Sequence, residues 1–173
     1  MALLLAAAVI VAAPARADVV DKAANGFTVK TVVQITATPE RTFLALADGI
    51  ARWWDPAHTW SGDAKNLSLS PTPGGCFCET LPPAGSVVHA TVNYLAPGHL
   101  LRMTGALGPL QEHAVVGTLT WQFDKSATGT TATVIYRVAG YFPGGFDPLA
   151  PVVDQVIGDQ LRRLKSYVER TSK

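Results

Sequence analysis

The segment LAPVVDQVIGDQLRRLKSYVER, residues 149–170, decides the fold class of this chain of 173 residues. Its apolar side chains recur every three or four positions, which is the period of one face of an α-helix. A long helix is therefore expected to begin at Asp147 or Pro148 and to end near Arg170, whose charge suits the negative end of the helix dipole. The apolar face of this helix comprises Leu149, Val152, Val153, Val156, Ile157, Leu161, Leu164 and Val168.

The chain before this helix is typical of an antiparallel sheet. Runs rich in Val, Ile, Thr and aromatic residues are separated by short turns that contain Pro and Gly, which favours hairpins over helical crossovers. Two short helices are expected after the first strand, one that Thr38 caps and that ends at Asp48, and one over 50–54. The expected strands cover residues 27–37, 66–70, 76–80, 87–95, 100–106, 114–124 and 130–140.

These elements predict a single α+β domain. One amphipathic helix has to bury its apolar face, and the sheet is the only other large layer that the sequence provides. The strand over 114–124 supports this arrangement, because its large apolar residues, such as Trp121 and Phe123, alternate with polar ones. We therefore expect a curved antiparallel β-sheet wrapped around the long C-terminal helix, with two short helices after the first strand.

Composition and charge exclude several classes of protein. Apolar residues make up 48% of the chain and charged residues 16%, so the chain can bury a core. The 14 Lys and Arg residues nearly balance the 13 Asp and Glu residues, and a net charge of +1 gives no long-range attraction to nucleic acid. No apolar run reaches the roughly 20 residues of a membrane-spanning helix, so no stable membrane insertion is expected.

The first 17 residues are typical of a secretory signal peptide. An apolar run over 2–13 is followed by Ala15-Arg16-Ala17, which is a small-residue cleavage motif. We therefore expect a signal peptide over 1–17, cleavage after Ala17, and a secreted, periplasmic domain over 18–173. Cleavage removes one basic residue, Arg16, and leaves 13 basic and 13 acidic side chains from the original 14 and 13.

The order of the elements and several short motifs resemble the START-like (Bet v 1-like, SRPBCC) superfamily, and within it the bacterial branch related to the Hsp90-ATPase activator. The resemblance covers residues 26–170, nearly the whole expected domain, and its motifs are structural rather than catalytic. It implies the helix-grip fold. The segments that carry it are 35–43 (ITATPERTF), 50–56 (IARWWDP), 73–75 (PGG), 92–101 and the turn at 129–130.

The resemblance also implies a cavity between the sheet and the long helix that holds a small hydrophobic or amphipathic ligand. Gly158, in the middle of the helix, either leaves room for such a ligand or lets a strand approach closely, and we take the first as the working hypothesis. The candidate ligand-binding residues are Trp54, His89, His113, Trp121, Tyr136, Tyr141, Phe142, Phe146, Val153, Ile157, Gly158 and Leu161.

Binding or carriage is the favoured function, and two alternatives remain. A cyclase or lyase would use polar groups in the cavity, such as His89, Glu112 or His113. A protein-interaction module like the chaperone activator is disfavoured, because the leader directs the chain out of the cytosol. The sequence contains no Ser-His-Asp order, metalloprotease motif, phosphate-binding loop or dinucleotide-binding motif, and it predicts no catalytic residue and no cofactor.

The two cysteines, Cys76 and Cys78, allow three alternatives. In an extended strand their Cα atoms lie about 6.5–7 Å apart, so a disulfide between them requires a bulge or a twist. An oxidising compartment nevertheless favours pairing. Two small buried thiols are the first expectation and a disulfide is the second. A metal site formed with His89 is the third, and it requires one particular hairpin register.

Overall fold

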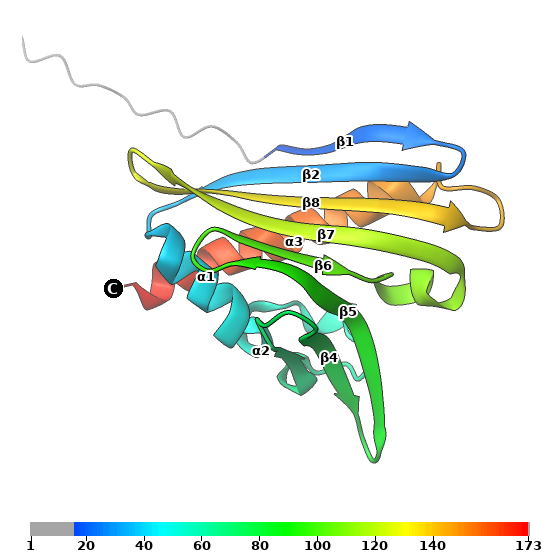
Figure 1. The fold of residues 1–173 in the computed structure, drawn as a ribbon, viewed down its shortest axis with the longest axis horizontal. Coiled ribbons are helices and arrows are strands. Elements are labelled where there is room, and N and C mark those ends of the chain that lie inside the picture. Colours follow the sequence, from blue (N-terminus) through cyan, green and yellow to red (C-terminus); the bar gives the residue numbers. More distant parts are fainter. Residues whose placement is uncertain (1–15, 173) are drawn as a thin grey trace, which may run out of the picture.

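The computed structural model describes residues 16–172, and it shows an antiparallel sheet that curves around one long helix (Figure 1). The eight strands follow the order β1-β2-β8-β7-β6-β5-β4-β3 across the sheet. This arrangement confirms the expected α+β helix-grip architecture. The strands are β1 (Arg16–Ala23), β2 (Gly26–Ile35), β3 (Leu67–Leu69), β4 (Cys76–Leu81), β5 (Gly85–Ala96), β6 (Leu100–Thr104), β7 (Ala114–Ser126) and β8 (Gly129–Tyr141).

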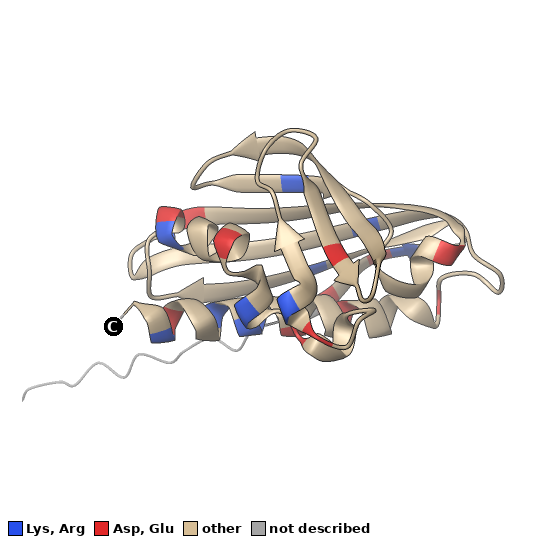
Figure 2. Ribbon diagram, turned by 90° about the horizontal axis from the view of Figure 1, so that it is seen from below, with Lys and Arg blue, Asp and Glu red and all other residues tan. Residues whose placement is uncertain are grey.

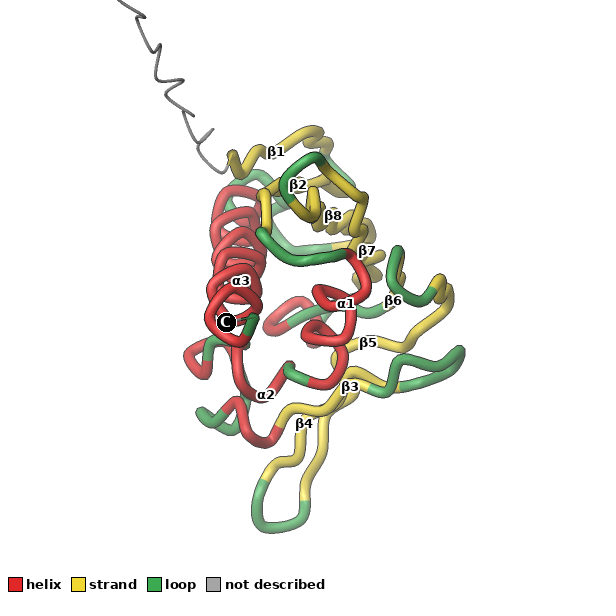
Figure 3. The backbone as a smooth tube through the Cα atoms, turned by 90° about the vertical axis from the view of Figure 1, so that its left-hand side faces the viewer, coloured by secondary structure: helices red, strands yellow, loops and turns green. Residues whose placement is uncertain are grey.

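The long helix lies in the concave side of the sheet, as the view in Figure 3 shows. Its side chains Ile157, Leu161, Leu164 and Val168 are buried among apolar side chains of the sheet. Burying one such side chain stabilises a fold by about 1.5–3 kcal/mol, so this face anchors the helix. The helices are α1 (Pro39–Asp48), α2 (Ile50–Trp53) and α3 (Leu149–Thr171), and short 3₁₀ turns are η1 (Pro56–His58), η2 (Ala64–Asn66) and η3 (Gly108–Glu112).

The passage from β2 to α1 follows the sequence signals. The Thr38 side chain accepts a hydrogen bond from the Arg41 amide at 3.3 Å, and Pro39 occupies the first turn. Gly49 ends α1, and α2 follows at once. The two helices close one end of the space between sheet and α3 (Figure 3).

Strand β1 is an element that the sequence did not predict. It pairs with β2 along the edge of the sheet, with an irregularity between Val19 and Asp21. Val19, Val20 and Asp21 are all exposed, so the strand lacks the alternation that reveals a half-buried strand in a sequence. Backbone pairing with β2, rather than side-chain burial, defines it.

The charged residues are scattered over the helices and strands with both signs interspersed, as Figure 2 shows for one side of the molecule. Lys165, for example, bridges the Gln34 carbonyl of β2 and the Glu169 carboxylate of α3. None of the helices in the described chain is long and apolar enough to cross a bilayer.

Candidate functional site

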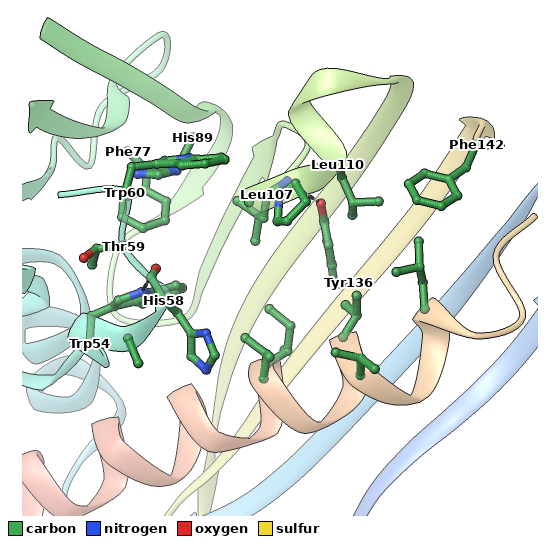
Figure 4. Close-up of a pocket in the computed structure, with 18 residues that line it drawn as sticks. Trp54, His58, Thr59, Trp60, Phe77, His89, Leu107, Leu110, Tyr136 and Phe142 are labelled. Atoms are coloured by element: carbon green, nitrogen blue, oxygen red, sulfur yellow. Dashed lines mark hydrogen bonds between the residues drawn. The ribbon is translucent and has the colours of Figure 1, made fainter. Parts of the chain in front are cut away.

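A cavity of about 390 Å³ lies between the first half of α3 and the concave side of the sheet (Figure 4). Its volume falls within the range of small-molecule sites. The helix contributes an apolar wall on successive turns, and the opposite wall comes from β4, β5 and β8. The helical lining residues are Leu149, Val152, Val153, Val156 and Ile157.

The segment after α2 forms one side of the cavity, over residues 57–60. Trp54 holds this segment, because its indole Nε1 donates to the His58 carbonyl at 3.0 Å. Asp55 caps η1 through a hydrogen bond from the Ala57 amide at 3.0 Å, and its own amide donates to Gln160 of α3 at 2.9 Å. The segment is therefore fixed to α3 by polar contacts, while Trp60 at its end stays 45% exposed.

Tyr136 of β8 fixes the other side of the cavity, where residues 107–110 contribute to the lining. Its hydroxyl donates to the Gly105 carbonyl at 3.1 Å and accepts from the Leu107 amide at 3.0 Å. Burial raises the pKa of this phenol far above its usual value, so it stays protonated. Gly117 of β7 makes the arrangement possible, because a Cβ at that position would overlap the Tyr136 ring.

The β4–β5 hairpin brings a titratable pair to the cavity wall. Phe77 lies opposite Ala90 and Cys78 lies opposite Val88, so His89 is an extra residue in β5. His89 faces the concave side by regular alternation from Val87, the partner of Glu79, and the bulge turns Ala90 to the same side, so both are buried. The His89 ring packs on Phe77, with 4.9 Å between ring centroids.

Glu79 lies behind His89, and the two side chains form a hydrogen-bonded pair. Glu79 Oε2 is 2.9 Å from His89 Nε2, and the side chain of Glu79 is fully buried. The carboxylate also accepts the amides of Trp60 at 3.0 Å and Ser61 at 2.5 Å. Glu79 thus ties the segment that carries Trp60 to the sheet.

The electrostatics of the pair favour an ionised Glu79 and a neutral His89. Burial raises the pKa of Glu79, but the hydrogen bonds from Ser61, Trp60 and His89 outweigh burial, and the pKa lies below its usual value. Burial lowers the pKa of His89 more than the neighbouring Glu79 raises it. At neutral pH the pair therefore carries one negative charge, which the backbone amides stabilise.

Six of the twelve ligand-binding residues predicted from the sequence line the cavity. They come from the end of α2, where Trp54 is the C-cap, from the sheet, from the segment after β8 and from α3, so no single local motif contains them. Phe142, for instance, is far from Trp54 in the sequence but borders the same cavity (Figure 4). The six are Trp54, His89, Tyr136, Phe142, Val153 and Ile157.

The other six predicted residues lie outside the cavity. Trp121 and Leu161 are core residues, and Trp121 packs against the Trp53 ring. Tyr141 faces outward and is 70% exposed. His113 and Phe146 each contact the Phe142 ring, so they support a lining residue without lining the cavity themselves.

Gly158 is the sixth, and its placement corrects the working hypothesis. It is buried but does not border the cavity. Asp154 and Lys165 share its side of α3, and these residues interact with Asp18 of β1 and Gln34 of β2 respectively. Gly158 therefore lies on the side of α3 that faces the β1–β2 edge, and a close approach of a strand at this position stays a prediction.

Sequence reasoning missed the partner of His89. Glu79 and His89 are ten residues apart on two strands, and the hairpin register, which pairs Glu79 with Val87, brings them onto one face. The available signal was Glu79 itself, an acidic residue that stands between Phe77 and Leu81 at an inward position of the strand. Glu112, named as a candidate together with His113, is exposed at the end of η3.

The cysteines form the second of the three expected arrangements. A disulfide joins Cys76 and Cys78, whose Cα atoms are 5.4 Å apart. This distance is shorter than in a regular strand, and the β4–β5 pairing is irregular between Phe77 and Cys78. The first expectation, two free thiols, is therefore wrong. The expected metal site does not form either, because His89 points to the concave side of the sheet and the cysteines lie on the opposite face. Residues 16–172 contain no cluster of three potential metal ligands.

Comparisons with known proteins agree with this geometry. Residues 26–169 match the model of a family described as polyketide cyclase / dehydrase and lipid transport. No curated protein matches the chain. A solved structure of an uncharacterised protein from Rhizobium leguminosarum is 17% identical, with a TM-score of 0.66 over 87% of this chain and 99% of that one. A protein from Rhodobacter sphaeroides is 16% identical, with a TM-score of 0.58 over 90% of this chain and 99% of that one. A protein from Chromobacterium violaceum is 17% identical, with a TM-score of 0.57 over 82% of this chain and 96% of that one. Both share the fold.

Proposed function

The chain belongs to the polyketide cyclase / dehydrase and lipid transport family, and from this membership and its cavity we propose that it binds a small, uncharged, hydrophobic or amphipathic molecule. The membership confirms the resemblance to the START-like superfamily, while the branch related to the Hsp90-ATPase activator stays a prediction. Binding or carriage is the function that the geometry supports best.

The composition of the cavity wall is the observation that carries this proposal. Aromatic and aliphatic side chains make up most of the wall, and the described lining includes no Lys, Arg, Asp or Glu. A charged ligand would lose its hydration in such a cavity without gaining an ion pair, which is costly. An uncharged apolar molecule gains free energy in proportion to the apolar area that it buries.

A cavity-filling variant tests the proposal. Val156 lines the cavity, whereas Gln155, one residue earlier, is exposed on the outer side of α3. We expect the wild-type protein to bind the uncharged fluorescent probe N-phenyl-1-naphthylamine. Val156→Trp should weaken binding by about tenfold or more, which corresponds to about 1.4 kcal/mol. Gln155→Trp is the matched control and should bind as the wild type does. Equal affinities for the two variants would contradict binding in this cavity.

An enzymatic function is the second candidate, and the Glu79–His89 pair favours it. A buried histidine that a carboxylate orients is a common form of general base. The two groups are 2.9 Å apart, and His89 reaches the cavity. Native mass spectrometry of protein purified from its own host would identify a retained molecule. Catalysis predicts that wild-type protein converts this molecule on incubation to a product of different mass, and that His89→Phe leaves it unchanged.

Export is part of the proposal. The leader sequence supports it, and so does the Cys76–Cys78 disulfide, because disulfides persist mainly in oxidising compartments. Most of the leader lies outside the described residues. We propose a periplasmic carrier whose mature chain begins at Asp18, within β1.

A further inference from the structure

Most polar atoms near the cavity are already used within the protein. The Tyr136 hydroxyl makes two hydrogen bonds to the backbone, and the Trp54 indole donates to the His58 carbonyl. The Thr59 hydroxyl donates to the Pro56 carbonyl at 2.8 Å. These groups shape the cavity, but they leave few polar atoms to orient a ligand. The rings of His58 and Trp60 also lack hydrogen-bond partners within residues 16–172, but they are exposed, whereas His89 is buried and only one of its two ring nitrogens has a partner.

The partner of Nε2 determines which nitrogen of His89 carries the proton. Glu79 is ionised, and an ionised carboxylate only accepts hydrogen bonds. Both of its oxygens already accept backbone amides, from Ser61 and Trp60. His89 Nε2 must therefore donate to Glu79, and a neutral imidazole with a proton on Nε2 has a bare lone pair on Nδ1.

Nδ1 is open to the cavity. It has no hydrogen-bond partner in residues 16–172, and it is accessible to solvent. The ring itself is only 6% exposed and lines the cavity. Packing on Phe77 and the hydrogen bond to Glu79 fix the ring from two sides, so Nδ1 is a preorganised acceptor in an apolar wall.

We propose that His89 Nδ1 accepts a hydrogen bond from a hydroxyl group of the ligand, so that the cavity selects uncharged apolar molecules that carry a hydroxyl, such as phenols and alcohols. This inference rests on the proposed function, since it names the class of molecule that the same cavity takes. A ligand that lacks the donor leaves the buried Nδ1 without a partner, and an unpaired buried acceptor is costly. Glu79 acts as a positioning residue, because it sets the tautomer of His89 without touching the ligand.

Displacement of the bound probe by two matched naphthalenes tests the proposal. 2-Naphthol carries a hydroxyl donor, and 2-methoxynaphthalene has a methyl ether in its place. Wild-type protein should prefer 2-naphthol by about tenfold. His89→Phe retains an aromatic ring but has no acceptor, and the preference should fall to near onefold. His99→Phe is the matched control, because His99 lies in the β5–β6 turn away from the cavity, and it should keep the wild-type preference.

A second measurement uses the wild-type protein alone and does not depend on the folding of a variant. In protein with ¹⁵N-labelled histidine, the NMR shifts of the imidazole nitrogens report the tautomer. We expect a protonated Nε2 and a bare Nδ1 at His89, and a shift of the Nδ1 signal when 2-naphthol binds. A proton on Nδ1, or a preference for 2-naphthol that is absent in the wild type or unchanged in His89→Phe, would overturn the proposal. Failure of the probe to bind at all would instead refute the proposed function.

Discussion

Replacing Glu79 by alanine should destabilise the protein strongly, although Glu79 is not on the cavity surface. The carboxylate accepts hydrogen bonds from the Trp60 amide, the Ser61 amide and His89 Nε2, and all three donors lose their partner in Glu79→Ala. A buried donor without a partner costs about 1–3 kcal/mol. Three donors at about 1 kcal/mol each, allowing for entry of water, give a loss of about 3 kcal/mol in the free energy of unfolding, which urea denaturation measures.

Glu112→Ala is the control, because Glu112 is exposed and its removal should change stability by no more than about 0.5 kcal/mol. The dependence on pH gives a second check. The pKa of Glu79 is lower in the folded protein than its ordinary value near 4.5, so the ionised form stabilises the fold above that pH. This stabilisation is lost as the pH falls through the folded-state pKa, and Glu79→Ala should lack that part of the acid dependence. A loss in Glu79→Ala no larger than in Glu112→Ala would refute the reasoning.

Three further predictions concern Gly158, the two cysteines and the leader. Gly158→Leu should lower the melting temperature, because overpacking against β1 and β2 costs about 1–3 kcal/mol. Binding of the fluorescent probe should not change. A variant that is more stable and no longer binds the probe would show that Gly158 borders the cavity. Thiol counting on unfolded protein purified from the periplasm should find no free thiol before reduction and two after it, from Cys76 and Cys78, whereas two reactive thiols at the outset would contradict the disulfide. Amino-terminal sequencing of exported protein should begin at Asp18, and intact Met1 on soluble cytosolic protein would contradict export.

The sequence determined the fold class because the strongest signals are local and periodic. The apolar face of residues 149–168 repeats with the period of a helix, and the burial of Ile157, Leu161, Leu164 and Val168 follows that period. The Thr38 cap and the turns with Pro and Gly set the boundaries of α1 and of the strands to within a few residues. Strand β1 was not predictable in this way, because an exposed edge strand needs only a backbone partner.

Only the tertiary structure decided which residues line the cavity. The periodicity of α3 shows which of its residues share a face. The position of the sheet decides that the face with Val153 borders the cavity and that the face with Gly158 does not. The register of the β4–β5 hairpin had the largest effect. The pairing of Glu79 with Val87 puts His89, two residues further along β5, on the face of Glu79, and it leaves the cysteines on the opposite face. In a strand a shift of one residue reverses the side to which every following side chain points, and the sequence contains no local signal that fixes such a shift.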